Sequence, residues 1–253
     1  MIYFLGDVHG QMDHVLPVLR ARQDTVAHVI FLGDIDSKRP FEEEIRPLLD
    51  AGIGVWFIHG NHDTDNRISW ENLQGSAHRN LSGRVVEIEG LRVAGLGGIF
   101  RGQVWHPDSP AKVNRSQCLR NYDEYIDWLK GKTPPRQHAS VKDTNNALKH
   151  LTTIFPDTYD QLADLKADIL VTHEAPSCHP HGFELIDLLA QSMGVKLLFH
   201  GHHHDSLNYQ GWEAKLGFRA HGVGYRGITD MRGVRVLAGY FDEARSDRES
   251  FWK

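Results

Sequence analysis

The chain of 253 residues lacks several features that would place it in other classes of protein. It has only two cysteines, Cys118 and Cys178, which are too few for a disulfide framework and suit a reducing compartment. No uninterrupted apolar run approaches the roughly 20 residues of a membrane helix, and residues 1–5 form a strand-like segment without the pattern of a signal peptide. We therefore expect a cytoplasmic protein that does not bind membranes.

An excess of positive charge is also missing. The 33 Asp and Glu residues outnumber the 28 Lys and Arg residues and leave a net charge of -5, so the sequence gives no strong sign of duplex nucleic-acid binding. Low-complexity linkers and internal repeats are absent, and we expect residues 1–253 to form a single domain. What the chain does have is 17 histidines, an excess that indicates metal chemistry.

Short apolar runs alternate with helical patterns through much of the chain, which is typical of an α/β fold. We predict strands at residues 2–5, 29–32, 55–58, 169–172 and 195–199, and helices at residues 12–22, 41–50 and 183–193. Residues 84–89 and 91–94, joined at Gly90, indicate a hairpin. Two later runs, residues 214–218 and 234–237, are expected to close a second sheet.

Residues 101–165 interrupt this alternation. The segment is polar and contains Pro107, Pro110, Pro134, Pro135 and Pro156, although residues 122–130 and 146–154 have helical patterns. We interpret residues 101–165 as a helical insert or cap within the domain.

Potential metal ligands follow the predicted strands, at the end where open α/β sheets bind their ligands. These side chains are Asp7 and His9, then Asp34, then Asn61, then His173, and finally His202 and His204. Beside Asn61, His62 is a candidate acid and Asp63 could orient its imidazole, whereas His203 should point away from its two neighbours. Each group alone has a simpler explanation, such as a solvated turn or a structural histidine. Five groups in this arrangement would be brought by the sheets to one edge, which predicts a metal site.

The series Asp7-x-His9, Gly33-Asp34, Gly60-Asn61-His62-Asp63, His173 and Gly201-His202-x-His204 resembles the calcineurin-like metallophosphoesterase superfamily over nearly the whole chain. The resemblance implies an α/β fold, a four-layer sandwich of two mixed β-sheets flanked by helices. It also implies two metal ions that share Asp34. One would be held by Asp7, His9, Asp34 and His204, and the other by Asp34, Asn61, His173 and His202.

Such a centre hydrolyses phosphomonoester or phosphodiester bonds by in-line attack of a metal-bridging hydroxide. We expect His62 to act as the general acid and Asp63 to orient its imidazole. The oxygen and nitrogen ligands favour Mn or Fe, with Zn, Co and Ni as alternatives. Arg39 and Arg101 are candidate contacts to the phosphate-ester substrate, for which a nucleotide is one candidate.

The second and third motifs differ from those of two related subfamilies. Protein Ser/Thr phosphatases and diadenosine tetraphosphatases continue the second motif to Asp-Arg-Gly, whereas here Asp36 comes one position early and Arg39 is displaced. The third motif ends in Asp63 where those phosphatases carry Glu. Enzymes of these two kinds are therefore alternatives to the general phosphoesterase. A non-catalytic scaffold of the same fold is disfavoured, because His62 and every expected ligand are present.

Overall fold

Alternate side chains of the strands enter different apolar layers. Ile2 and Phe4 of β1 (Ile2–Leu5) pack into a central layer, where the rings of Phe4 and Phe199 stack with their centroids 3.6 Å apart. Tyr3 and Leu5 enter an outer layer that is lined by helices. Because neighbouring side chains of a strand point to opposite faces, a strand that is covered on both sides is apolar throughout.

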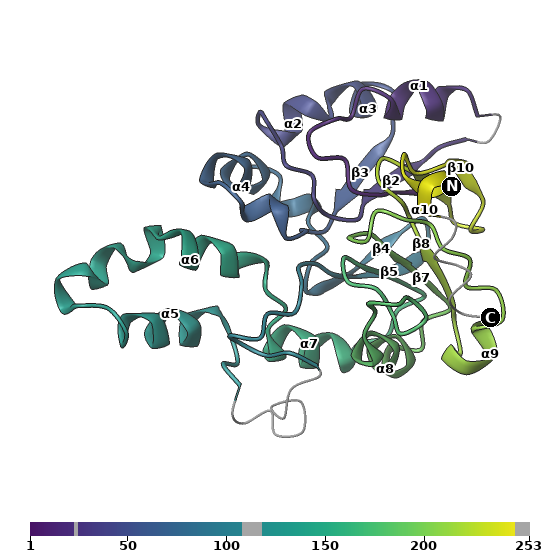
Figure 1. Ribbon diagram of the computed structural model, residues 1–253. Coiled ribbons are helices and arrows are strands. Elements are labelled where there is room, and N and C mark those ends of the chain that lie inside the picture. The colour runs from purple at the N-terminus through teal and green to yellow at the C-terminus, as the bar shows by residue number, and fades with distance from the viewer. Residues whose placement is uncertain (23–24, 108–117, 246–253) are drawn as a thin grey trace.

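The computed structural model describes residues 1–22, 25–107 and 118–245, and it shows two five-stranded sheets face to face (Figure 1). The first sheet has the order β10-β9-β1-β2-β3, and the second has the order β4-β5-β6-β7-β8. Their remaining strands are β2 (His28–Phe31), β3 (Gly54–Phe57), β4 (Arg84–Ile88), β5 (Leu91–Leu96), β6 (Ile169–Thr172), β7 (Leu197–His200), β8 (Arg219–Gly222), β9 (Ile228–Asp230) and β10 (Arg235–Leu237). The predicted sandwich of two mixed sheets is confirmed.

Helices cover the outer faces of both sheets. The outer layer of the first sheet includes residues of α1 (Val15–Arg20), α2 (Phe41–Glu44), α3 (Arg46–Asp50) and α4 (Arg67–Gln74). The outer layer of the second includes residues of α7 (Pro156–Ala163), α8 (Glu184–Met193) and α9 (Glu213–Leu216), and the same apolar cluster continues away from the sheet into α5 (Tyr122–Lys130) and α6 (Asn145–Lys149) (Figure 1). A short α10 (Asp242–Arg245) lies near the C-terminus, and short 3-10 helices include η1 (His62–Thr64), η2 (Ala77–Arg79), η5 (Pro135–Asp143) and η6 (His150–Thr152). In the described parts of the chain, no helix is long and apolar enough to cross a bilayer.

Several predicted elements coincide with those of the structure. The strands at residues 2–5 and 169–172 and the helix at residues 122–130 match β1, β6 and α5 at both ends. The predicted hairpin is β4 and β5, which pair antiparallel. The helix predicted at residues 41–50 is divided into α2 and α3 at Ile45, because Pro47 has no N–H to continue the helical hydrogen bonds.

The two late runs were assigned incorrectly. Residues 214–218 belong mainly to helix α9, which ends at Gly217 with a left-handed φ of 80°, and the strand that follows is β8. Residues 234–237 contain β10, which joins the first sheet and not the second. A turn at Gly233, with φ of 83°, directs β10 back against β9, and β9 pairs with β1.

The segment at residues 101–165 has two structural parts besides residues 108–117, which lie outside the described residues. In Figure 1, α5 and α6 project from the sandwich as an arm, whereas α7 lies beside α8. Pro156 begins α7 instead of breaking a helix, because the first helical position does not need an N–H. Tyr159 and Leu162 of α7 are buried in the outer apolar layer of the second sheet.

Candidate metal centre

The C-terminal ends of the parallel strands bring the acidic ligands together. Strands β1 and β2 are parallel, so Asp7 and Asp34 follow them at the same edge of the sheet. The two loops are joined by a backbone hydrogen bond of 3.0 Å, in which the N–H of His9 donates to the carbonyl of Asp34. This bond fixes the two loops relative to each other.

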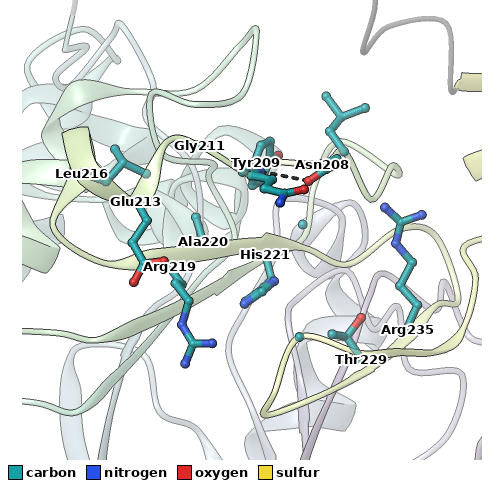
Figure 2. A pocket seen from close by; sticks show the side chains of 14 residues that line it. Asn208, Tyr209, Gly211, Glu213, Leu216, Arg219, Ala220, His221, Thr229 and Arg235 are labelled. Carbon is teal, nitrogen blue, oxygen red and sulfur yellow. Dashed lines mark hydrogen bonds between the residues drawn. The ribbon is translucent and has the colours of Figure 1, made fainter.

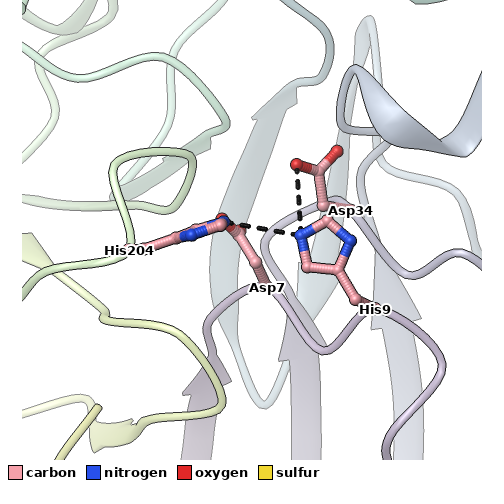
Figure 3. A group of neighbouring side chains, drawn as sticks. All are labelled: Asp7, His9, Asp34 and His204. Carbon is pink, nitrogen blue, oxygen red and sulfur yellow. Dashed lines mark hydrogen bonds and ion pairs between the residues drawn. The ribbon is translucent and has the colours of Figure 1, made fainter. Parts of the chain in front are cut away.

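All seven predicted ligands meet at this edge. The ligand atoms of Asp7, His9, Asp34 and His204 lie within 4.8 Å of one another, and Figure 3 shows these side chains converging, with Asp7 and His9 on the same loop. Asp34, His173 and His202 form a second group by the same criterion. The amide oxygen of Asn61 lies 3.2 Å from Nε2 of His173, which places it at the second group. The two groups share Asp34, as the sequence predicts.

The carboxylates of Asp7 and Asp34 leave two oxygens that are suited to a cation. Oδ2 of each residue is buried and, among the described residues, accepts no hydrogen bond. Its neighbours are histidine nitrogens that could bind the same cation, with Nε2 of His204 3.1 Å from Asp7 and Nε2 of His173 3.4 Å from Asp34. A buried carboxylate oxygen without a partner is costly unless a positive charge compensates it. Although burial lowers the pKa of His173, the charges of Asp34 and Asp7 raise it to about 10. The site therefore has surplus negative charge, which fits metal ions.

A hydrogen bond orients the imidazole of His173. Its Nδ1 lies 2.7 Å from the carbonyl oxygen of Leu32, which can only accept, so Nδ1–H is the donor. Nε2 is then directed at the carboxylate of Asp34, 3.4 Å away. Metal-binding histidines commonly donate their second N–H to a carbonyl or carboxylate in this way.

Backbone strain is concentrated at the same edge. His9, Asp34, His202 and His204 have positive φ angles of 43°, 47°, 71° and 59°, which are uncommon for residues with a side chain. Such conformations persist where the surrounding structure determines them, and they cluster at functional sites. Glycine is required close by at Gly60, where a Cβ atom would lie 2.2 Å from Oδ1 of Asp34.

His62 stands beside the ligand groups with a carboxylate partner of its own. Its Nδ1 lies 2.6 Å from Oδ2 of Asp65, and its ring centroid lies 5.1 Å from that of His9. Burial lowers the pKa of His62, but the hydrogen bond to Asp65 and the charge of Asp34 outweigh this effect and raise it. A raised pKa favours the protonated imidazolium, which can donate a proton.

The expected contact between Asp63 and His62 is wrong. Oδ1 and Oδ2 of Asp63 accept hydrogen bonds from the backbone N–H groups of Asp36 and Gly60, at 2.8 Å and 2.7 Å. Asp63 therefore fixes two loops. The contact with His62 that we expected from Asp63 is made by Asp65. Residues His62 to Thr64 form a 3-10 helix, in which side chains three positions apart lie above one another.

Arg101 is a buried cation near this site. It is 8% exposed, and its Nη2 donates a hydrogen bond to Oγ1 of Thr152 at 3.4 Å. Nε and Nη1 are buried and have no hydrogen-bond partner among the residues that the structure describes. Burial lowers the pKa of Arg101, while the charges of Glu174, Asp65 and Asp34 oppose that shift. Arg101 thus lies close to the carboxylates of the site without pairing with one of them.

Two further residues of this region were missed from the sequence. Glu174 is 4% exposed, accepts a hydrogen bond from the N–H of Phe100 at 3.0 Å, and lies 4.0 Å from Nε2 of His202. Burial raises the pKa of Glu174 to about 7. Its position directly after His173 was the available signal. Asp65 could have been found from its spacing of three residues from His62.

Two cavities lie at other parts of the surface. Arg39 is exposed and lines a cavity of about 400 Å³ with Gly10 and residues of α1 and α3. A second cavity of about 300 Å³ lies between β8 and the β9–β10 hairpin, and Figure 2 shows Arg219, His221 and Arg235 in its wall. The second cavity contains none of the predicted site residues.

The fold and the site define an α/β protein with two adjoining groups of side chains that could hold metal ions. A family model described as "Calcineurin-like phosphoesterase" matches residues 1–206, and the chain belongs to this family. An "Uncharacterized protein" of Haemophilus influenzae is 38% identical over 239 residues, which are 94% of this chain and 96% of that protein. The crystal structure of TT1561 of Thermus thermophilus matches with a TM-score of 0.50 and 17% identity, over 91% of this chain and 94% of that one, and supports the fold alone.

Proposed function

We propose that this protein is a metal-dependent hydrolase of phosphomonoester or phosphodiester bonds. The observation that carries the proposal is the pair of ligand groups that share Asp34 and contain two buried carboxylate oxygens without a hydrogen bond. Asp7, His9, Asp34 and His204 would hold one ion, and Asp34, Asn61, His173 and His202 the other. The mixed oxygen and nitrogen ligands favour Mn or Fe.

The bound ions would supply a water of lowered pKa and neutralise charge on the phosphate during in-line attack. The chain's own residues would hold the ions in position: backbone N–H groups of His202 and His62 donate to Oδ1 of Asp7 and Asp34, which leaves Oδ2 of each carboxylate for an ion. Because the ligands come from five separate loops, their geometry depends on the whole edge of the sandwich. Preorganised charge of this kind is a large contribution to catalysis.

His62 is the proposed general acid. Its Nδ1 is engaged by Asp65, so Nε2 is the atom that would carry a proton to the leaving oxygen. Asp63 acts on the position of His62 through the two loops that it ties together. We therefore assign Asp63 a positioning role in place of direct proton transfer.

Arg101 and Arg39 are the proposed contacts to the substrate. The buried guanidinium of Arg101 has two unpaired donor atoms, and a phosphate oxygen is a partner that suits its charge and geometry. Arg39 reaches solvent from the loop after Asp34 and would contact a larger substrate. We further propose a single domain at residues 1–253, an insert at residues 101–165 and a cytoplasmic location, which suits a chain with only two cysteines.

Hydrolysis of para-nitrophenyl phosphate and of its bis-ester by the Mn²⁺-loaded protein tests this function. We expect release of nitrophenol from at least one of the two compounds, and a preference for the bis-ester would indicate a phosphodiesterase. Metal content is measured on the same sample. Two bound ions per chain together with no hydrolysis of either compound would contradict the proposal.

A further inference from the structure

An aromatic cluster adjoins the first ligand group through Tyr225 and continues from there to two further rings. The ring centroid of Tyr225 lies 5.2 Å from that of His204 and 5.7 Å from that of His9. Phe241 stacks on Tyr225 at 5.4 Å, and Tyr240 stands edge-on to Phe241 at 5.0 Å. We call Tyr225, Tyr240 and Phe241 the aromatic shelf.

The shelf is held firmly although part of it is exposed. The N–H of Tyr240 donates to the carbonyl of Tyr225 at 2.8 Å, and the guanidinium of Arg245 lies 5.0 Å from the ring centroid of Phe241. Tyr240 is nevertheless 75% exposed. Single exposed apolar residues are common, but Tyr240 belongs to a group of three rings in which Tyr225 contacts both His9 and His204, and packing alone does not explain such an exposed group beside the candidate ligands.

A positive charge adjoins the shelf. Nη1 of Arg226 donates to Oε1 of Gln11 at 2.8 Å, and Gln11 donates from Nε2 to the hydroxyl of Tyr225 at 3.1 Å. The other neighbour of the guanidinium is Nδ1 of His14, at 3.3 Å. Arg226 is therefore held by neutral side chains, and its charge is available to an anion. Flat rings beside a cation and a phosphate-binding centre are complementary to a nucleotide.

We infer that the aromatic shelf binds the base of a nucleotide whose phosphoester lies at the metal centre. This inference rests on the proposed function and names the class of its substrate. Stacking of a base on aromatic side chains tolerates any base, because every base has a π face. The aromatic shelf would therefore bind a nucleotide more tightly than a sugar phosphate without a base. It would not distinguish strongly between different bases. Arg101 borders the second ligand group, so the two flanks would contact different parts of the substrate.

Binding of two probes that differ only in the base tests the inference. Calorimetry compares adenosine 5′-monophosphate with ribose 5-phosphate, using Mn²⁺-loaded protein in which His62→Ala prevents turnover. We expect the nucleotide to bind at least about fivefold more tightly, and Tyr240→Ala to bring the two affinities to within about twofold. Tyr240→Trp keeps a ring at this position and should preserve the preference. Tyr240 is exposed, so its replacement leaves the apolar layers intact.

Leu188→Ala provides a matched control. Leu188 is 49% exposed on α8, outside the site, and its replacement should leave both affinities unchanged. Equal binding of the two probes by the protein with Tyr240 intact would overturn the inference, and so would a preference that survives Tyr240→Ala. Hydrolysis is measured separately on the chain with His62 intact. If the protein hydrolyses phosphate esters but binds the two probes equally, only the role of the shelf is refuted. If it binds two metal ions and shows no hydrolysis, the proposed function is refuted.

Discussion

The strand ends and the flanking loops of the site are built differently. At the strand ends, Asp7, Asp34 and His173 are fully or almost fully buried, and backbone bonds fix their loops. On the flanks, Arg101 is a buried cation without an acidic partner, and Tyr240 is an exposed ring. The carboxylates at the strand ends thus lack only a cation. On the flanks, the guanidinium of Arg101 and the ring of Tyr240 have surface that a substrate could contact. This difference supports the proposal that the strand ends bind the metal ions and that the flanks contact the substrate.

The largest effect should come from His62, which stands between the two regions. We expect His62→Ala to lower kcat by about 10²- to 10⁴-fold, because a positioned general acid contributes in this range. Metal content should stay at the unmodified level, since His62 belongs to neither ligand group. Steady-state kinetics and elemental analysis measure the two quantities. Loss of a metal ion from this variant would assign His62 to the strand-end ligands.

Arg101→Met tests the buried flank. We expect kcat/KM to fall by about 10- to 100-fold, as for a hydrogen bond to a charged group. The free energy of unfolding without substrate should rise by about 1 kcal/mol, because an unpaired buried charge is removed. Urea denaturation measures stability. Arg39→Ala is the comparison variant, because Arg39 is exposed whereas Arg101 is buried. We expect it to lower kcat/KM less than Arg101→Met does and to leave the free energy of unfolding unchanged. A stability loss in Arg101→Met would show that Arg101 supports the fold.

Asp65→Asn should have a smaller effect than either replacement. It keeps the size of the side chain and removes the charge that raises the pKa of His62. We expect kcat to fall by about 2- to 12-fold, in line with one hydrogen bond. Glu71→Gln on α4 is the control, because Glu71 is exposed and should not affect kcat. An unchanged kcat in Asp65→Asn would show that Asp65 does not assist proton transfer by His62.

The metal ligands could be predicted from the sequence because each follows its strand directly. Parallel pairing then brings the strand ends together regardless of the chain between them. The spacing of three residues between His62 and Asp65 is visible in the sequence, but only the 3-10 turn that begins at His62 shows that Asp65, and not Asp63, contacts the imidazole. The aromatic shelf depends on β9, a strand of three residues, and on the turn that returns the chain to Tyr240. So short a strand gives no recognisable alternation of apolar and polar residues. The contact between the aromatic shelf and the first ligand group could therefore not be predicted from the sequence.

Metal stoichiometry tests the central claim, that two ions share Asp34. Elemental analysis after loading with Mn²⁺ should give two ions per chain for the unmodified protein. Asp34→Ala should lose both ions, whereas His204→Ala, which removes a ligand from one group only, should retain the ion at Asn61, His173 and His202. Retention of two ions by Asp34→Ala would contradict the account.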